Sequence, residues 1–407
     1  MAKKPNIRFA GFEDDWEQRK LGEVCVRVTR KNKNNESDLP LTIASQYGLI
    51  DQRDFFNKVI AAKDMSNYYL LKKGEFAYNK SYSKGFDYGS IKRLNAYEQG
   101  CLSTLYICFS IETDEVDSDY LECFFDTLSW YHDVSAICAE GARNHGLLNV
   151  DVEAFFKDVN IEMPSQIQEQ RKISVFINTL DHLITLHQRK CDETKKLKKI
   201  MLQKMFPKKG EKNPEIRFNG FTNDWEQRKL GEVAEYRNGK AHENNISETG
   251  KYVVVNSKFV STDGEVRKFS AEQIEPLYEG EIAFVLSDVP NGRAIARTFL
   301  VDESGKYTLN QRIAGITPNE HTDSYFLHIL MNRNKYFLKF DDGNKQTNLS
   351  VNDVMQFEER YPSYREQTKI GAYFSTLDHL ITLHQRKCEE LKNVKKYMLQ
   401  NMFAKGE

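Results

Sequence analysis

Two stretches of the chain, one in the middle and one at the end, repeat apolar positions every seven residues. The first row reads Ile173, Leu180, His187, Thr194 and Met201, and the second reads Ile370, Leu377, His384, Leu391 and Met398. A companion row reads Phe176, Leu183 and Leu197 in the first stretch and Tyr373, Leu380 and Val394 in the second. Two such rows are typical of a long helix that packs along another helix.

Signals at the start of both stretches support this interpretation. Pro164 and Pro362 stand just upstream, and Glu169 and Glu366 lie in the first turns, where a carboxylate complements the helix dipole. A helix over residues 165–206 is roughly 60 Å long at about 1.5 Å per residue. Two helices with the same seam and a globular insert between them bury their apolar rows most simply against each other. We therefore expect an antiparallel intramolecular coiled coil.

An internal repeat divides the chain into halves. The thirteen letters TLDHLITLHQRKC begin at Thr179 and return unchanged at Thr376. The twenty residues PNIRFAGFEDDWEQRKLGEV from Pro5 match PEIRFNGFTNDWEQRKLGEV from Pro214 at sixteen positions. Each half starts and ends on a constant segment, which predicts a pseudo-twofold internal repeat.

The segments between the constant blocks, residues 25–140 and 234–342, cannot be aligned with each other. The patterns YVVVNSKFV, EIAFVLSDV and GCLSTLYICFSI indicate strands, and DYLECFFDTLSWYH and DSYFLHILMNRNKYFLKF indicate helices. We expect an α/β (α+β) protein with two globular mixed domains joined by two long helices. The expected parts are a first domain over 1–163, a helix over 164–206, a linker over 207–213, a second domain over 214–361 and a helix over 362–407.

Composition limits the environment and the partners. No run of eighteen apolar residues occurs and 29% of residues are charged, so we expect a soluble, cytoplasmic protein without a membrane span. The seven cysteines form no Cys-x-x-Cys pair, which favours free thiols in a reducing compartment. The formal net charge of -1 argues against a general binder of polyanions, so any nucleic-acid surface must be local.

Motifs of self-contained enzymes are missing. The sequence has neither a G-x-x-x-x-G-K-[ST] loop nor a G-x-G-x-x-G loop, which argues against nucleotide binding. An amino-methyltransferase needs an Asn/Asp-Pro-Pro-aromatic motif, and the string NPEI at Asn213 lacks the second proline. Glu193 and Lys195 resemble a nuclease Glu-x-Lys but have no Asp-bearing strand before them. We expect no catalytic residues in this chain.

His187 and His384 lie on the apolar seam and admit two interpretations. They are either metal or proton-switch residues, or polar seam residues that fix the register of the helix pair, and we favour the second. The basic stretch Arg189–Lys212, with ten Lys or Arg against three acids, stays open between a solvated helix face, a track for phosphates and a docking surface for an acidic partner.

Candidate DNA-contacting residues lie in loops where basic, amide and aromatic side chains alternate. Paired hydrogen bonds let Arg and Lys read guanine, and let Asn and Gln read adenine. A loop of this type recurs where GARNHGLLNVDVEAFF from Gly141 lies over GNKQTNLSVNDVMQFE from Gly343; an ordinary surface loop is the alternative for each residue. The candidates are Lys80, Tyr82, Lys84, Tyr88, Lys92, Arg93, Arg143, Asn144, His145, Arg237, Asn238, Lys240, His242, Arg293, Lys345, Gln346 and Asn348.

These features together resemble the specificity subunits of type I restriction-modification systems. The resemblance covers the whole chain and rests on DWEQRKLGEV at Asp15 and Asp224, the EQRKI and EQTKI junctions, the LDHLITLHQRK helices and the GNKQTNLSVNDV loop. It implies two target-recognition domains, each reading one half of a bipartite site in double-stranded DNA. The first-half loop departs from the pattern, because Gly141-Ala142-Arg143 stands in place of Gly-Asn-Lys.

The resemblance also implies partners and cofactors. Two modification subunits would bind the helices and domains, carry S-adenosylmethionine and methylate a flipped adenine. Two restriction subunits would add ATP- and Mg-dependent cleavage. The helices would fix the spacer between the half-sites, about one helical turn or roughly 34 Å. Two alternatives remain: a scaffold for two copies of a protein that is indifferent to DNA, and a nuclease with duplicated domains.

Overall fold

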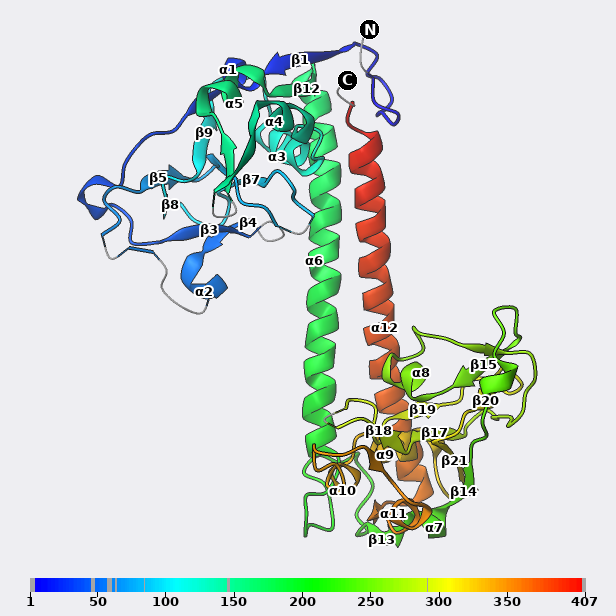
Figure 1. The fold of residues 1–407 in the computed structure, drawn as a ribbon. Helices are drawn as coiled ribbons and strands as arrows, with labels where there is room; N and C mark the ends of the chain where they lie inside the picture. The colour runs from blue at the N-terminus through cyan, green and yellow to red at the C-terminus, as the bar shows by residue number, and fades with distance from the viewer. Residues whose placement is uncertain are drawn as a thin grey trace. The chain divides into compact units, whose positions relative to one another are not determined.

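The computed structural model describes residues 4–44, 48–56, 61–62, 64–83, 85–144, 147–290 and 292–404. The chain forms two compact units (Figure 1). Unit 1 comprises Met1–Gln188 and Arg386–Glu407, and unit 2 comprises Arg189–Gln385. Each unit thus holds one globular part together with portions of both long helices, α6 (Ile167–Lys204) and α12 (Tyr364–Asn401).

The globular part of unit 1 is built on a four-stranded antiparallel sheet. Its order is β2 (Cys25–Arg27), β9 (Ile107–Ile111), β6 (Phe76–Asn79) and β7 (Ser90–Arg93). The two-stranded pairs are β1 (Trp16–Lys20) with β12 (Asn160–Pro164), β3 (Leu41–Ala44) with β4 (Gly48–Asp51), β5 (Tyr69–Lys72) with β8 (Gln99–Leu102), and β10 (Cys138–Asn144) with β11 (Leu147–Val150). The helices are α1 (Leu21–Val24), α2 (Gln52–Phe56), α3 (Ser118–Asp126), α4 (Tyr131–Ile137) and α5 (Val152–Asp158), with a 3-10 turn over Lys33–Asn35.

Unit 2 repeats the same central sheet from unrelated sequence. Its order is β14 (Ala234–Asn238), β21 (Ile313–Pro318), β17 (Ile282–Val285) and β19 (Thr298–Leu300), again antiparallel throughout. A second sheet has the order β16 (Phe269–Ser270), β15 (Tyr252–Val255) and β20 (Tyr307–Leu309), and the strand pairs are β13 (Glu226–Lys229) with β23 (Glu358–Tyr361) and β18 (Ser287–Asp288) with β22 (Thr347–Asn348). The helices are α7 (Leu230–Val233), α8 (Ser257–Ser261), α9 (Ser324–Met331), α10 (Lys335–Leu338) and α11 (Val351–Met355), with a 3-10 turn over Glu243–Asn245. The two middle segments therefore share a sheet although their sequences cannot be aligned.

Portions of α6 and α12 pack antiparallel inside each unit. In unit 1, Asp181 of α6 pairs with Lys395 of α12, and Ile184 of α6 lies beside Cys388 of α12. The residue numbers increase along α6 while those of their partners in α12 decrease, so the two helices run in opposite directions. In unit 2 the same holds for Cys191 with Ile381 and for Lys198 with Asp378. Mixed α/β domains joined by long helices are thus the observed fold class.

The companion row of the seam lies one residue later than the sequence indicated. Ile173 and Leu180 are buried as expected, but their buried companions are Ile177 and Cys191, whereas Leu183 is half-buried and Leu197 is 40% exposed. In α12 the buried residues are Ile370, Phe374, Leu377, Cys388 and Leu391, whereas Leu380 is half-buried and Val394 is 40% exposed. The difference arises because Cys191 and Cys388, which act as small apolar residues, belong to the row. His187 and His384 are half-buried.

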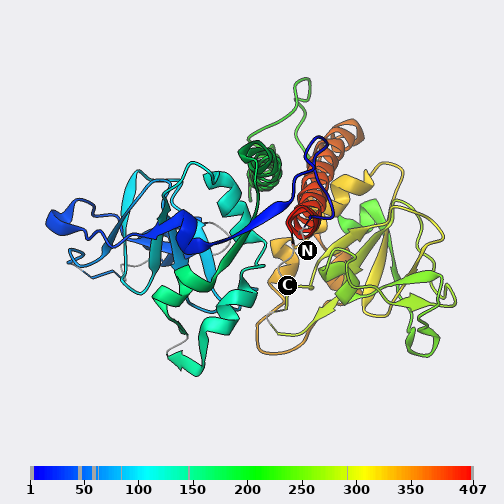
Figure 2. The ribbon, with the colours of Figure 1, turned by 90° about the horizontal axis from the view of Figure 1, so that it is seen from above.

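The far end of each helix completes the core of the unit in which it ends. Met402 and Phe403, just beyond α12, are buried in unit 1 beside Trp16 and Tyr120. Met205 and Phe206, just beyond α6, pack in unit 2 beside Trp225. The start of the described chain accordingly lies beside the end of α12 (Figure 2), where Ile7 N donates to Asn401 O at 2.9 Å. Met205, Met402 and Phe403, at the KMF and NMF ends of the repeat, are therefore core residues, and Phe206 packs against the core.

Candidate nucleic-acid interface

A buried ion pair anchors the constant start of each half to its long helix. Arg8 Nε and Nη2 donate to the two carboxylate oxygens of Glu169 at 2.7 and 2.8 Å, and the Glu169 side chain is 1% exposed. Arg217 repeats both bonds to Glu366 at 2.7 and 2.8 Å. The hydrogen bond to Glu169 raises the pKa of Arg8 above its ordinary value. Planar bidentate pairs of this kind fix geometry, so the repeated Arg and Glu hold the constant segments in the same place in both units.

A buried glutamine joins the same helix to the globular part. Gln170 Nε2 donates to Pro164 O at 2.9 Å, and its Oε1 accepts from Asp117 N at 2.8 Å. Asp117 in turn caps α3 by accepting from Tyr120 N. In unit 2, Gln367 makes the corresponding bonds to Pro362 and to Asp323, the cap of α9. The EQRKI and EQTKI junctions thus build a common frame that presents each globular part.

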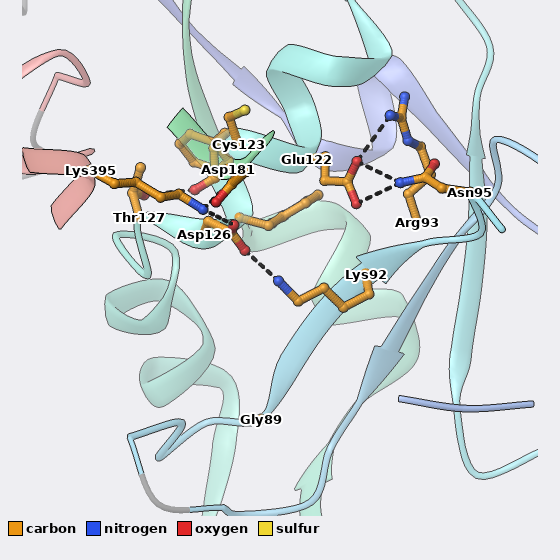
Figure 3. Close-up of polar contacts among 12 residues, drawn as sticks. Gly89, Lys92, Arg93, Asn95, Glu122, Cys123, Asp126, Thr127, Asp181 and Lys395 are labelled. Atoms are coloured by element: carbon orange, nitrogen blue, oxygen red, sulfur yellow. Dashed lines mark hydrogen bonds and ion pairs between the residues drawn. The ribbon is translucent and has the colours of Figure 1, made fainter. Parts of the chain in front are cut away.

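A chain of alternating charges links the sheet of unit 1 to both long helices (Figure 3). Lys92 on β7 pairs with Asp126 at 2.6 Å, Asp126 pairs with Lys395 at 3.4 Å, and Lys395 pairs with Asp181 at 2.7 Å. Burial alone would lower the pKa of Lys395, but the two carboxylates outweigh it and the pKa is raised. In unit 2, Asp378 accepts from Lys198 and from the Tyr325 hydroxyl. The repeated Asp of TLDHL is therefore a clamp between helices.

Four of the candidates are at least partly buried and are held by internal partners. Lys92 belongs to the chain of charges, and Arg93 pairs with Glu122 (Figure 3). Arg93 is also held by Ser118 and Asp119, and the side chains of Lys92 and Arg93 are both only 13% exposed. Arg237 bonds Glu275 and Glu281 at 2.6 Å each. His242 is 1% exposed and bonds the Thr308 hydroxyl at 2.8 Å. These four stay candidates, but the surface defined below leaves them out because their polar groups already have partners within the unit.

Four other candidates meet on one exposed surface of unit 2. β18 and β22 pair antiparallel with Ser287 opposite Asn348, and Gln346 Nε2 donates to the Ser287 hydroxyl at 2.8 Å. This pairing brings the loop that carries Arg293 beside the loop that carries Lys345. The exposed candidates on this surface are Arg293, Lys345, Gln346 and Asn348. These four residues, with exposed Val289 and with buried Ser287 as the partner of Gln346, form a candidate surface that we call the unit 2 reading surface.

The remaining candidates of unit 2 lie at the end of β14. Asn238 is exposed and accepts from the Tyr236 hydroxyl at 2.8 Å. The Lys240 side chain is 62% exposed and pairs with Glu275 at 2.8 Å. These two stay candidates, although Lys240 shares its carboxylate partner with Arg237.

The corresponding loop of unit 1 follows β6. Leu148 N on β11 donates to Lys80 O at 2.9 Å, which places this loop beside the β10–β11 pair. Tyr82 is 50% exposed, Tyr88 packs edge-on against Tyr131, and burial lowers the pKa of Lys80. Lys84 and His145 lie outside the described residues. Arg143 and Asn144 lie on β10, where only the backbone is described.

Sequence reasoning misaligned the segment after these loops and missed part of the surface. Leu21 N bonds Val159 O and Leu230 N bonds Phe357 O, so Val159, not Phe155, corresponds to Phe357. Ser287 and Val289 carry no motif, and only their proximity to Gln346 identifies them. Within the described parts of the chain, no group of three or more His, Cys, Asp or Glu is placed to hold a metal ion.

Comparison with known proteins finds similarity to one family. The model of the type I restriction modification DNA specificity domain matches residues 222–393. The type I restriction enzyme MjaVIII specificity subunit of Methanocaldococcus jannaschii is 26% identical over 284 residues, which cover 65% of this chain and 65% of that relative. Residues 222–393 thus match the model of this DNA specificity domain, and the chain is similar to a type I specificity subunit.

Solved specificity subunits have the same fold. The S subunit of a type I restriction-modification system from M. genitalium aligns with a TM-score of 0.64 at 16% identity, covering 99% of this chain and 100% of that chain. A chain from a study of complex assembly and conformational transition of the type I R-M system aligns with a TM-score of 0.51 at 15% identity, covering 97% and 99%. No helix in the described parts of this chain is long and apolar enough to cross a membrane.

Proposed function

We propose that this chain is the non-catalytic DNA-reading subunit of a type I restriction-modification complex, and that each unit reads one half of a bipartite site. One observation carries the proposal: the same frame is built twice around different surfaces. The frame residues Arg8, Glu169 and Gln170 recur as Arg217, Glu366 and Gln367 with the same bonds. A repeated frame with different loops suits a protein that meets two unlike half-sites in one geometry.

The unit 2 reading surface has the side chains that direct readout needs. Arg293 and Lys345 suit guanine edges or phosphates, and Gln346 and Asn348 suit adenine edges. In unit 1 the loop after β6, with Tyr82 half-exposed, takes the corresponding place.

Each unit also carries a matched exposed apolar pair on a long helix, which we assign to partner docking. Leu197 and Ile200 on α6 are 40% and 38% exposed in unit 2, and Val394 and Tyr397 on α12 are 40% and 56% exposed in unit 1. The two pairs correspond in the repeat, so they suit two copies of one protein, the methyltransferase. S-adenosylmethionine would be bound by that partner, and ATP and Mg by restriction subunits. The seven free thiols fit a cytoplasmic complex.

The long helices suit a role as spacer. Each runs for 38 residues, about 57 Å at about 1.5 Å per residue. Inserting a helical turn at matched places in α6 and α12 should lengthen the unread spacer and leave both half-sites unchanged. An unchanged spacer would exclude this role.

A gel-shift experiment tests the proposal as a whole. The purified complex of this chain with its methyltransferase is expected to select one bipartite sequence from a random duplex pool, with affinity that falls steeply with salt. Binding without sequence preference, or indifference to salt, would favour a protein scaffold instead. The chain alone, incubated with DNA and magnesium, is expected to give no cleavage, because a nuclease with duplicated domains would cut.

A further inference from the structure

A single carboxylate organises the loop that follows β18 in unit 2. Asp288 accepts hydrogen bonds from Val289 N at 2.8 Å, Ala294 N at 2.5 Å and Ile295 N at 3.1 Å. Ala294 and Ile295 are buried, with 7% and 0% exposure. The returning end of the loop is therefore anchored in the core, and its start is tied to the same side chain.

A glycine leaves the room that this closure requires. A Cβ at Gly292 would lie 2.1 Å from Asp288 Cγ, closer than real Cβ contacts allow. Gly292 N also donates to Val289 O at 2.9 Å, which closes a turn between the two residues. The position of Val289 is thus set by the backbone and by Asp288.

Val289 is an exposed apolar residue close in sequence and register to polar candidates. Val289 is 64% exposed, and Arg293 at the other side of the turn is exposed too. The β18–β22 pairing ends with Asp288 opposite Thr347. The next residues beyond this pair are Val289 on the side of β18 and Gln346 on the side of β22. A scattered exposed valine needs no explanation, but Val289 is hydrogen-bonded at both its N and its O and follows directly on the strand pairing that places Gln346.

We propose that Val289 reads a thymine in the second half-site by contact with its C5 methyl group, and that Asp288 positions it. The inference rests on the proposed DNA-reading function and adds a base to it. In the major groove, thymine differs from the other bases by this methyl group, and small apolar side chains recognise it. Gln346 and Arg293, on either side, would contact the neighbouring adenine and guanine edges.

Deoxyuridine substitution isolates this contact, because uracil lacks only the methyl group. The purified complex is titrated with the selected bipartite duplex, and each thymine of the second half-site is replaced in turn. One replacement is expected to weaken binding about fourfold, the size expected for one buried methyl group. Val289→Ala is expected to weaken binding to the thymine duplex and to abolish the further loss with uracil.

Controls separate reading from folding and from assembly. Val266→Ala removes a valine that is 43% exposed in the same unit and should keep the full uracil penalty. Asp288→Ala should lose the penalty because it frees the turn without removing Val289, and it should also lower the melting temperature because Ala294 N and Ile295 N lose their acceptor. No uracil-sensitive thymine, a penalty that persists in Val289→Ala, or a Val289→Ala complex that fails to assemble would each overturn the inference. A complex that selects no bipartite sequence at all would instead refute the proposed function.

Discussion

Removing the arginine that pairs with a buried glutamate should unfold one unit before the other. In Arg8→Ala the Glu169 side chain, 1% exposed, loses two charged hydrogen bonds and stays buried. Breaking a buried ion pair by removing one partner costs about 3–5 kcal/mol. For a unit of this size each kcal/mol lowers the melting temperature by about 2–4 °C, so we expect a loss of about 6–20 °C.

Calorimetry and hydrogen exchange measure this effect and locate it. The exchange of backbone amides in β1, β12 and the start of α6 should accelerate, and that in unit 2 should not. Lys4→Ala is the matched control on the same segment, because the Lys4–Asp15 pair is 55% and 58% exposed and such pairs contribute about 0–1 kcal/mol. Arg8→Met with Glu169→Leu should recover most of the loss, since apolar residues replace buried ion pairs with little cost. A shift below 2 °C in Arg8→Ala, or one equal to that of Lys4→Ala, would refute the reasoning.

Two further predictions concern the ion pairs between the long helices and the buried His328. Lys395→Met leaves Asp126 and Asp181 without their shared cation, so it should destabilise unit 1 by about 2 kcal/mol and speed amide exchange in α3. Lys198→Met should instead speed amide exchange in α9. Equal exchange rates in α3 and α9 for both variants would contradict this. Burial lowers the pKa of His328 to about 4. Between pH 6.5 and 4 the unfolded chain therefore binds a proton that the folded chain does not. The free energy of unfolding should decrease by up to about 3 kcal/mol as the pH is lowered through this range. Urea unfolding of His328→Asn should lose that component, and identical pH profiles for both proteins would show that His328 does not contribute.

Local periodicity and repetition predicted the frame because both depend on short-range pattern. The heptads of α6 and α12 gave their bounds to within a few residues, and the EQ junctions marked where helices begin. The companion row was displaced because Cys191 and Cys388 are apolar in this context, which a pattern of Leu and Phe does not reveal. The segment YVVVNSKFV, predicted as one strand, forms strand β15 followed by helix α8, because the Asn256 side chain caps the start of the helix.

Strand pairing and ion pairs between residues far apart in sequence could not be predicted from the local pattern. The common four-stranded sheets of the two units come from segments without similar letters, because any suitably apolar strands can form the same ladder. Arg237 and Lys92 have the composition of DNA readers, but partners distant in sequence, Glu281 and Asp126, occupy them. Arg293 and Gln346 are of similar residue types but are exposed, which distinguishes them from Arg237 and Lys92.

Genome-wide mapping of methylated adenines tests most directly whether each unit reads its own half-site. The map is recorded in cells that express this chain with its methyltransferase, and again after residues 25–140 are replaced by the corresponding segment of another specificity subunit. The account predicts a bipartite motif in which one half changes while the spacer and the other half persist. A continuous motif, or a change in both halves, would contradict it.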